Sequence, residues 1–343
     1  MYRERLLLRS SLRGAIRISS ESLRALFKPE SVAVVGASAV PGRIGHAIMK
    51  NILEYGFSGV VYPVNPKYDE VMGLRCYHSV EELPGPVDMA VIAIPARLVP
   101  GVVDVLGEKG CRVAVVISSG FGEVGNRELE AELVERARRH GMRVLGPNIF
   151  GVFYAPSRLN ATFGPRDVIP GSIAFITQSG ALGIALMGWT ITEGIGLSAL
   201  VSVGNKADID DDDLIETLGE DESTRVIVIY MEGVRDGRRF MEAASRVSRV
   251  KPIIVVKAGR SERGRRAASS HTGALAGSDE VYSSAFRQAG VLRAGNVQEA
   301  FDWALAFSSG RTPRGDSVVI VLSLIHISEP TRPRLISYAV FCL

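Results

Sequence analysis

The sequence predicts an α/β fold with two doubly wound domains, a Rossmann-like domain followed by a flavodoxin-like domain. Short apolar runs rich in Val and Ile alternate with helical segments along most of the 343 residues. Strands of that composition are typical of a parallel sheet that is covered by helices on both faces. The 36 glycines and the low aromatic content of 7% fit the tight strand–helix turns of this architecture.

The first domain is predicted over residues 24–150. Apolar runs predict its strands, and helical spacing that ends in Gly predicts the helices between them. In chain order these are strand SVAVVGAS (31–38), helix RIGHAIMKNILEYG (43–56), strand GVVYPVNP (59–66), strand VDMAVIAIP (87–95), helix LVPGVVDVLGEKG (98–110), strand RVAVVISSG (112–120), helix NRELEAELVERARRHG (126–141) and strand RVLGPN (143–148).

The second domain is predicted over residues 151–312, with its regular pattern beginning near residue 171. A strand at GDSVVIV within 313–321 would open a third, truncated domain. The predicted elements of the second domain are strand, turn and helix in GSIAFITQSGALGIALMGWTITEG (171–194), strand GLSALVSVGN (196–205), helix DIDDDDLIETLGED (208–221), strand TRVIVIYMEGV (224–234), helix GRRFMEAASRVSRV (237–250), strand KPIIVVKAG (251–259), helix SDEVYSSAFRQAG (278–290) and a short strand and helix in VLRAGNVQEAFDWALAFSS (291–309).

Charge and composition exclude several classes of function. Residues 1–28 hold seven Lys/Arg against two Asp/Glu, so they more than account for the net charge of +3. The rest of the chain is slightly acidic and predicts no nucleic-acid partner. No apolar run reaches membrane-spanning length, and the basic leader 1–23 has no secretory cleavage site. The three cysteines lack metal or disulfide spacing, which predicts a reducing cytoplasm and no metal site.

The C-terminal stretch 322–343 differs in style from the sequence before it. LSLIHISEPTR and ISYAVFCL within it resemble the conceptual translation of a sequencing-library adapter. We therefore expect this stretch to lie outside the fold, and the natural chain to continue past Val321.

A glycine-rich turn follows the first predicted strand. Gly36, Gly42 and Gly45 open a helix in GASAVPGRIG, where backbone N–H groups and the helix dipole suit a phosphate. The spacing is not G-x-G-x-x-G, and VNPK after the second strand offers no acid for a ribose, so a nicotinamide cofactor is disfavoured. The turn predicts either a phosphate-bearing nucleotide or a tight junction without a ligand. Lys67 would meet a phosphate or lie solvated on the surface.

Three loops are expected at the carboxyl ends of the first domain's strands, where open α/β sheets bind ligands. They are VNPK (64–67), IPAR (94–97) and ISSGFGE (117–123). Pro95 fixes the direction of the chain and removes a donor. Backbone and hydroxyl groups are expected at Ser118, Ser119 and Gly120. Together the loops predict a rim for an adenine ring and its phosphates.

The second domain repeats this arrangement at TQSGAL and YMEGV. Gln178, Ser179 and Gly180 stand where a strand meets a helix, whose first N–H groups need an anion or a cap. Self-capping by Ser179 is compatible with an anion. Glu232 follows a buried strand on the ligand-binding side. It is either functional or an ordinary loop glutamate.

His271 lies in SSHTGALAG, after the polar stretch AGRSERGRRAASS that predicts a long mobile loop. The small residues around it allow close approach to another surface. Imidazole is largely neutral and nucleophilic at physiological pH. Glu232 could bond one ring nitrogen and leave the other free to attack phosphorus, while the helix start at Ser179 holds the phosphoryl group. The alternative is an incidental histidine on a glycine-rich surface loop.

Taken together, the motifs of residues 24–321 resemble the α-type portion of ADP-forming acetyl-CoA synthetases, within the NDP-forming acyl-CoA synthetase superfamily. They are ALFKPESVAVVGAS, VYPVNPKY, VIAIPA, RVLGPN, TQSGALG, SVGNKADID, YMEG and SSHTGALAG. The resemblance implies a CoA-binding domain followed by succinyl-CoA-ligase-like domains. The implied reaction is acyl-CoA + ADP + phosphate ⇌ carboxylic acid + CoA + ATP.

The resemblance also implies roles for individual residues. His271 stands at the phosphohistidine position, and Glu232 at the position of its partner glutamate. The stretch at Gln178, Ser179 and Gly180, with Thr272 and Gly273 beside the histidine, corresponds to phosphate-binding positions. The implied CoA contacts are Gly36, Ala37, Ser38, Gly42, Lys67, Pro95, Ala96, Ser118, Ser119 and Gly120.

The nucleotide-binding ATP-grasp module of the family is absent from this sequence. The resemblance therefore implies ADP/ATP with Mg²⁺ bound by an ATP-grasp β subunit or a fused C-terminal half, without which the chain is inactive for the full cycle. Two other functions stay open at this point, the CoA-binding region of a protein-lysine acetyltransferase and a non-catalytic CoA-binding sensor or scaffold. The identity of the small carboxylic acid is not marked by any motif.

Overall fold

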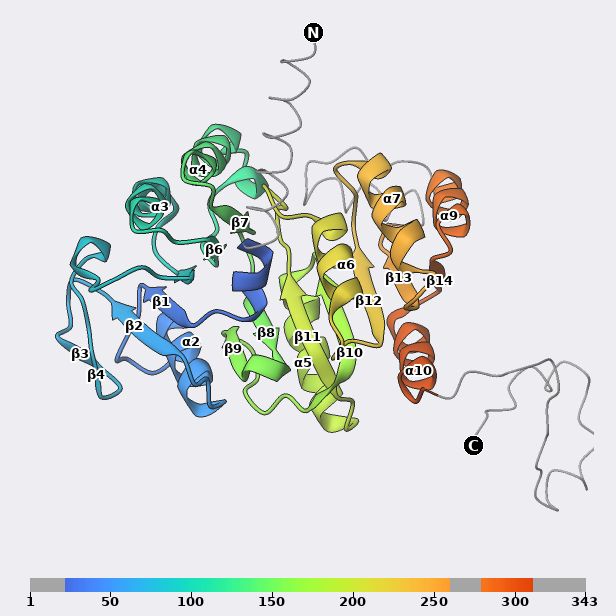
Figure 1. Ribbon diagram of the computed structural model, residues 1–343, viewed down its shortest axis with the longest axis horizontal. Helices are drawn as coiled ribbons and strands as arrows, with labels where there is room; N and C mark the ends of the chain where they lie inside the picture. Colours follow the sequence, from blue (N-terminus) through green and yellow to red (C-terminus); the bar gives the residue numbers. More distant parts are fainter. Residues whose placement is uncertain (1–21, 260–278, 311–343) are drawn as a thin grey trace, which may run out of the picture. The chain divides into compact units, whose positions relative to one another are not determined.

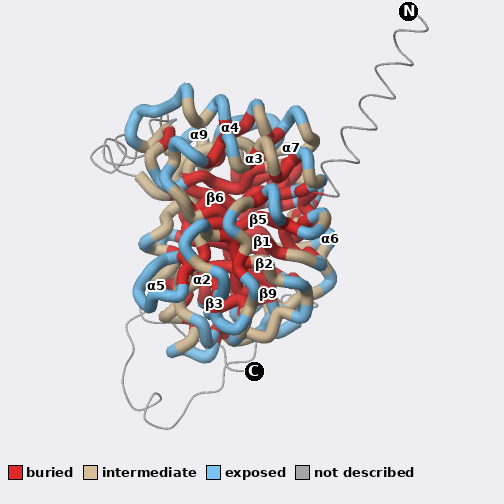
Figure 2. The backbone as a smooth tube through the Cα atoms, turned by 90° about the vertical axis from the view of Figure 1, so that its left-hand side faces the viewer, coloured by how far each residue is buried: buried red, intermediate tan, exposed pale blue. Residues whose placement is uncertain are grey.

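The computed structural model describes residues 22–259 and 279–310, which form two large β-sheets with helices on both faces of each (Figure 1). The first sheet has five parallel strands in the order β2-β1-β5-β6-β7. Its Val-rich central strands are almost fully buried, as Figure 2 shows. The strands are β1 (Ser31–Val35), β2 (Val60–Val64), β5 (Met89–Ile92), β6 (Val113–Val116) and β7 (Arg143–Leu145).

Helices cover both faces of this first sheet. The helix α2 (Ile44–Glu54) packs on one face, while α3 (Val99–Glu108) and α4 (Arg127–Arg139) pack on the other. Helical residues 22–27 precede β1 and bury Leu26 in the same core as α2. Leu23, the last residue of the predicted leader, is buried in the same core.

The second sheet has seven strands in the order β14-β13-β12-β10-β11-β8-β9. The first five of this order are parallel, whereas β8 and β9 join the edge at β11 in antiparallel pairing. The strands are β8 (Gly151–Tyr154), β9 (Leu159–Thr162), β10 (Pro170–Thr177), β11 (Leu197–Ser202), β12 (Val226–Met231), β13 (Ile253–Lys257) and β14 (Leu292–Ala294).

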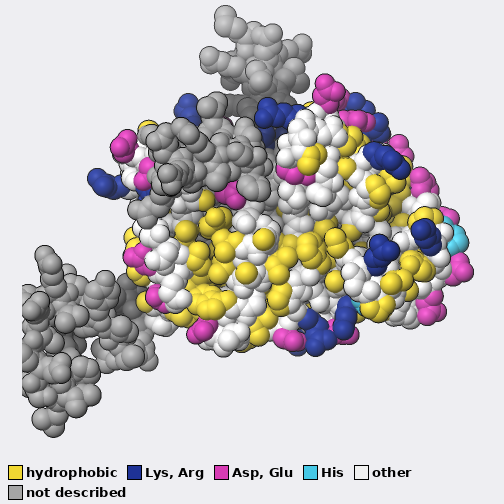
Figure 3. All heavy atoms as spheres, turned by 180° about the vertical axis from the view of Figure 1, so that it is seen from behind, with side chains coloured by type: hydrophobic (Ala, Val, Ile, Leu, Met, Phe, Trp, Pro, Cys, Tyr) yellow, Lys and Arg dark blue, Asp and Glu magenta, His cyan; other side chains and the backbone are white. Residues whose placement is uncertain are grey.

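Two layers of helices enclose the second sheet. Buried side chains of α5 (Gly180–Thr192) and α10 (Val297–Ser308) share one core, and those of α6 (Asp211–Glu220), α7 (Gly237–Val247) and α9 (Asp279–Gln288) share another. The helix α10 leaves Leu305 and Phe307 exposed. Hydrophobic side chains gather on the face turned away from the viewer of Figure 1 (Figure 3).

Strand order places the ligand-binding edges. Numbered along the chain, the parallel strands of both sheets follow the order 2-1-3-4-5, one of the two common doubly wound arrangements. In such sheets ligands bind at the carboxyl ends of the two strands where the winding direction changes. These are β1 and β5 in the first sheet, and β10 and β12 in the second. The glycine turn after β1 and the loops after β10 and β12 are the stretches that the sequence selected.

Four strands were not predicted. The antiparallel strands β8 and β9 are four residues each and buried throughout, so they show no alternation of polar and apolar residues. The strands β3 (Glu70–Val71) and β4 (Leu74–Arg75) form a hairpin. Each strand has only two residues, which is too short for a periodic pattern in the sequence. No helix in the described ranges is both long and apolar enough to cross a membrane.

Candidate functional site

The glycine turn after β1 is shaped by close backbone contacts. Gly36 has a φ of +93°, and a Cβ there would lie 2.3 Å from the Ala93 carbonyl oxygen. A Cβ on Gly45 would lie 1.9 Å from the Gly36 oxygen, so strand and helix approach too closely for side chains. Gly42 also has positive φ but faces open space. The helix α2 starts at Ile44 without a side-chain cap, which leaves its first N–H groups available to an anion.

The two residues after Gly36 contribute mainly backbone. Ala37 is fully buried, and its carbonyl accepts a hydrogen bond from Asn65 Nδ2 at 2.8 Å. The Ser38 hydroxyl accepts from the Val40 N–H at 3.1 Å. Asn65 Oδ1 also accepts from the backbone N–H of Lys67 at 3.0 Å. Asn65 thus ties the loop after β2 to the loop after β1, a role that sequence reasoning missed although VNPK was singled out.

The remaining predicted CoA residues lie along the carboxyl ends of β2, β5 and β6. Lys67, Pro95 and Ser119 are exposed, while Ala96 and Gly120 are half-buried. A Cβ on Gly120 would lie 3.1 Å from the Ala96 Cβ, so the loops after β5 and β6 touch here. The structure therefore brings these residues to one edge of the sheet.

Some polar groups of the loop after β6 are already bonded within the protein. The Ser118 hydroxyl donates to the Ile94 carbonyl at 2.5 Å, which joins the ends of β5 and β6. The Gly120 N–H donates to Glu123 Oε1. Burial raises the pKa of Glu123, but hydrogen bonds from Asn205 and from the Gly120 N–H outweigh burial and lower it. A ligand here would meet chiefly exposed Ser119.

In the second sheet, β10 leads into α5 through a closed turn. The Thr177 hydroxyl accepts from the Ser179 N–H at 3.2 Å and donates to the Ser179 carbonyl at 3.0 Å. The Ser179 hydroxyl caps α5 by accepting from the Leu182 N–H at 3.4 Å. Gly180 has open space where a Cβ would lie. The helix is thus self-capped, and room remains beside its first turn.

Gln178 joins this helix start to Glu232. Its Oε1 accepts hydrogen bonds from the backbone N–H groups of Glu232 at 2.9 Å and Gly233 at 3.1 Å. The two predicted elements after β10 and β12 are therefore in direct contact. Glu232 is half-buried at the carboxyl end of β12.

Two buried lysines, at the carboxyl ends of the neighbouring strands, bond the backbone carbonyls of Glu232 and Gly233. Lys206, after β11, donates to the Gly233 carbonyl at 2.9 Å. Lys257, at the end of β13, donates to the Glu232 carbonyl at 2.8 Å. Sequence reasoning missed both. The only available signal was a lysine beside the carboxyl end of an otherwise apolar run.

The two lysines differ in electrostatics. Burial lowers the pKa of Lys206, but the charges of Asp211 and Asp210 outweigh burial and raise it above its usual value. Burial also lowers the pKa of Lys257, and there it prevails over the charge of Asp279. Burial raises the pKa of Asp211 to about 6 despite its contact with Lys206.

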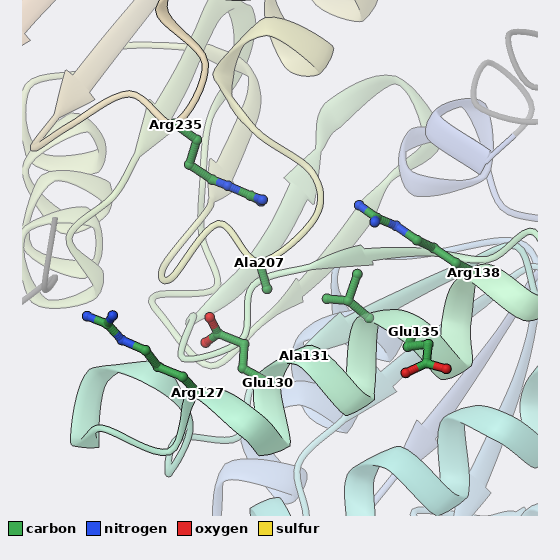
Figure 4. Close-up of a pocket in the computed structure, with 8 residues that line it drawn as sticks. Arg127, Glu130, Ala131, Glu135, Arg138, Ala207 and Arg235 are labelled. Carbon is green, nitrogen blue, oxygen red and sulfur yellow. The ribbon is translucent and has the colours of Figure 1, made fainter.

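A cavity of about 400 Å³ lies between α4 and the loops after β11 and β12. Figure 4 shows Arg127, Glu130 and Arg138 entering from α4, and Arg235 from the loop after β12. None of the predicted site residues lines it. The lining residues are Arg127, Glu130, Ala131, Val134, Glu135, Arg138, Ala207 and Arg235.

His271, Thr272 and Gly273 lie outside the described residues. The described chain stops at Gly259, two residues after β13, and resumes at Asp279, the first residue of α9. Because β13 pairs with β12, the described chain stops beside the strand that leads to Glu232.

Comparisons with known proteins match both halves of the chain. A model described as a CoA binding domain matches residues 30–155, and one described as a succinyl-CoA ligase like flavodoxin domain matches residues 170–307. The α subunit of acetate–CoA ligase (ADP-forming) I of Pyrococcus furiosus is 64% identical over 306 residues, which cover 88% of this chain and 66% of that protein.

Two further relatives agree. Acetate–CoA ligase (ADP-forming) I of Archaeoglobus fulgidus is 52% identical over 82% of this chain and 41% of its own length. A solved structure of dinucleotide forming acetyl-coenzyme A synthetase 1 of Ca. Korarchaeum cryptofilum, in complex with phosphate and ADP, is 59% identical with a TM-score of 0.84 and covers 85% of this chain and 64% of that one. This chain spans between two fifths and two thirds of these relatives' length. It belongs to the NDP-forming acyl-CoA synthetases, as a relative of the α-type portion of the ADP-forming acetate–CoA ligases.

Proposed function

We propose that this chain is the α-type part of an acid–thiol ligase that interconverts acyl-CoA, ADP and phosphate with a carboxylic acid, CoA and ATP. The relatives named above are ligases of this kind, and both matched domains belong to such enzymes. The relatives and family models support neither a protein-lysine acetyltransferase region nor a CoA-binding scaffold. The division into domains at 24–150 and 151–312 stays part of this proposal.

CoA would bind at the carboxyl edge of the first sheet. The uncapped start of α2, the positive-φ turn at Gly36 and the exposed Lys67 supply backbone donors and a charge for its phosphates. Pro95, Ala96 and Ser119 would line the remainder of the site. ADP or ATP with Mg²⁺ would bind to an ATP-grasp partner, either a β subunit or a fused half. A cytoplasmic location fits the free, buried thiols of Cys76 and Cys111.

The proposed chemistry passes one phosphoryl group through His271. An oxygen of phosphate attacks the thioester carbonyl, the C–S bond breaks, and acyl phosphate and CoA form. The neutral imidazole then attacks phosphorus, and the carboxylate leaves as the P–O bond breaks. Finally ADP takes the phosphoryl group, which restores neutral imidazole. Glu232 would hold the other ring nitrogen, so that the correct tautomer is presented.

One observation carries this proposal for the second sheet. The two hydrogen bonds from the Glu232 and Gly233 amides to Gln178 place the loop after β12 against the start of α5. The backbone at Glu232 and the start of α5 are thus close in the fold, which supports a common site in which Glu232 would orient the imidazole and the helix start would hold the phosphoryl group.

Phosphorylation of the chain tests the proposal directly. The chain is incubated with acetyl [³²P]phosphate, or with acetyl-CoA and [³²P]phosphate. We expect acid-labile, base-stable label on the native chain and none on His271→Ala. Label that survives in His271→Ala, or a native chain that takes up none from either donor, would refute the phosphohistidine.

Binding of CoA is measured separately, by calorimetric titration of the full chain. We expect saturable heat that weakens in Lys67→Ala as a phosphate contact is lost. A native chain without saturation would remove CoA from the proposal.

A further inference from the structure

Three side chains hold the Glu232–Gly233 dipeptide through the N–H and C=O groups of both residues. Gln178 Oε1 accepts both amide N–H groups, at 2.9 and 3.1 Å. Lys257 Nζ donates to the Glu232 carbonyl at 2.8 Å, and Lys206 Nζ donates to the Gly233 carbonyl at 2.9 Å. The three side chains come from the ends of β10, β11 and β13. We call Gln178, Lys206 and Lys257 the peptide clamp.

Lys206 is held in an unusual conformation. Its φ is +55°, in the left-handed region that residues with a Cβ seldom adopt. Its side chain is only 2% exposed and pairs with Asp210 at 3.3 Å and with Asp211. Arg235, two residues after Gly233, donates back to the Lys206 carbonyl. Such a backbone persists where the surroundings determine it fully, and it is concentrated at functional sites.

Lys257 is a buried cation that bonds carbonyls. The residue is 5% exposed, and its ammonium reaches the carbonyls of Glu232 and Ala258 at 2.8 and 2.6 Å. The ammonium also lies 4.6 Å from the ring centre of Tyr282. Within the described ranges no carboxylate lies within ion-pair distance of it. Burial of an ammonium is costly even where the charges of Asp279 and Glu232 offset part of the cost, so a packing role alone would be served better by an apolar side chain.

We propose that Gln178, Lys206 and Lys257 are positioning residues that hold the Glu232–Gly233 peptide, and through it Glu232, in one place at the carboxyl edge of the sheet. Side chains that orient a reacting group need such support from residues around them. The inference rests on the proposed function, because it assigns the clamp to the site of Glu232.

Amide hydrogen exchange tests the clamp without any assumption about activity. In the native chain we expect slow exchange at Glu232 and Gly233, since both N–H groups are bonded. Gln178→Met removes the acceptor and Lys257→Met removes the ammonium, while each keeps a side chain of similar length. We expect exchange at these two amides to become at least about tenfold faster in both variants. Unchanged exchange would overturn the clamp.

Lys251→Met is the matched control. Lys251 precedes β13 at its amino end, and it likewise donates to two backbone carbonyls, those of Leu218 and Asp221. Its substitution removes the same kind of contact at the opposite end of the strand. We expect no change in exchange at Glu232 and Gly233.

Labelling rates then separate a positioning role from a merely structural one. We expect Lys257→Met to slow labelling of His271 by acetyl [³²P]phosphate about tenfold at saturation. In a Glu232→Gln background the same substitution should have almost no further effect, because it acts through Glu232. A tenfold loss that persists in that background would overturn the positioning role. If the native chain takes up no label, the proposed function fails, and the exchange measurement still decides the clamp.

Discussion

Buried aspartates at the start of α6 and just before it sit in contrasting environments. Asp208 is 4% exposed, and burial would raise its pKa, but the charge of Arg143 and hydrogen bonds from Arg143 and the Val144 N–H lower it. Asp212 is 6% exposed, and burial followed by the charge of Asp213 raises its pKa to about 6, despite the nearby Arg239. The two carboxylates therefore contribute to stability with opposite pH dependence.

Asp212→Asn is expected to stabilise the chain at pH 8. Because the folded pKa of Asp212 lies above its unfolded value, the folded state binds more protons between about pH 4 and 6. The contribution of Asp212 is favourable below that window and is lost as the pH rises through about 6. The neutral amide of Asn does not ionise, so this loss of stability does not occur in the variant. We expect its free energy of unfolding to exceed that of the native chain by on the order of 1 kcal/mol at pH 8, and by almost nothing near pH 4. Urea unfolding at both pH values measures it, and a gain that is equal at both would contradict the assignment.

At this scale the sequence predicted that Gln178 and Glu232 lie at one edge of the sheet, though not what holds them there. Gln178 and Glu232 were selected because each follows a strand in a short polar motif, and parallel strands bring such motifs to one edge. Lys206 and Lys257 gave no comparable signal, because a lysine in sequence is solvated far more often than buried. Their role depends on carbonyls that only the folded backbone brings near. The roles predicted for His271, Thr272 and Gly273 stay predictions.

The parallel elements were predictable from periodicity. Each of the ten parallel strands lies in a segment for which the sequence predicts a strand, and the central strands are rich in Val and Ile because they are buried on both faces. The antiparallel strands β8 and β9 were missed because LNAT in β9 is polar in composition yet buried. Asn160 and Thr162 bond each other there at 2.7 Å, which satisfies polar groups that the sequence alone would place on the surface.

At the level of one helix, Ser179 caps α5 and is proposed to lie at the phosphate site, and two substitutions can separate these roles. Ser179→Ala removes the cap of α5, so we expect a loss of about 1 kcal/mol in the free energy of unfolding. Ser179→Asp keeps a capping oxygen but adds negative charge where the phosphoryl group is proposed to sit. We therefore expect near-native stability with loss of His271 labelling. Thermal unfolding and the labelling assay distinguish the roles, and normal labelling of Ser179→Asp would argue against a phosphate site at this helix.

Across the whole molecule, buried polar contacts join the two sheets. Arg143 on β7 of the first sheet reaches Asp208 at 2.7 Å, in the loop after β11, and Asp213 at 2.8 Å, in α6, which packs on the second sheet. Asn51 on α2 donates to the carbonyls of Thr162 and Gly164 at 2.8 and 2.9 Å. These contacts hold the first sheet against the part of the chain that carries Glu232. The sequence could not predict them, because their partners are up to 113 residues apart.

Asp208→Asn tests how much this junction contributes. The variant keeps an oxygen for the Val144 N–H but removes the carboxylate charge that faces the 16%-exposed Arg143 side chain, while the ion pair between Arg143 and Asp213 stays. Removing one carboxylate from a buried ion-pair network is destabilising, so we expect the free energy of unfolding near pH 7 to fall by about 3 kcal/mol. Because the folded pKa of Asp208 is lowered, its contribution is complete above the ordinary carboxyl pKa and is lost on acidification. The difference in unfolding free energy between the variant and the native chain, measured by urea unfolding, should therefore become smaller below about pH 4.

Glu54→Gln is the control for a surface contact between the same parts of the chain. Glu54 at the end of α2 pairs with Arg166 beyond β9, but their side chains are 44% and 42% exposed. Solvent screens such a pair, so we expect a loss below about 1 kcal/mol. Two results would show that burial of the ion pair does not stabilise the junction. One is an equal loss of unfolding free energy in Asp208→Asn and Glu54→Gln, and the other is a loss in Asp208→Asn that does not change as the pH falls. A larger, pH-dependent loss for Asp208→Asn would instead mean that this buried ion pair stabilises the packing between the two parts of the chain.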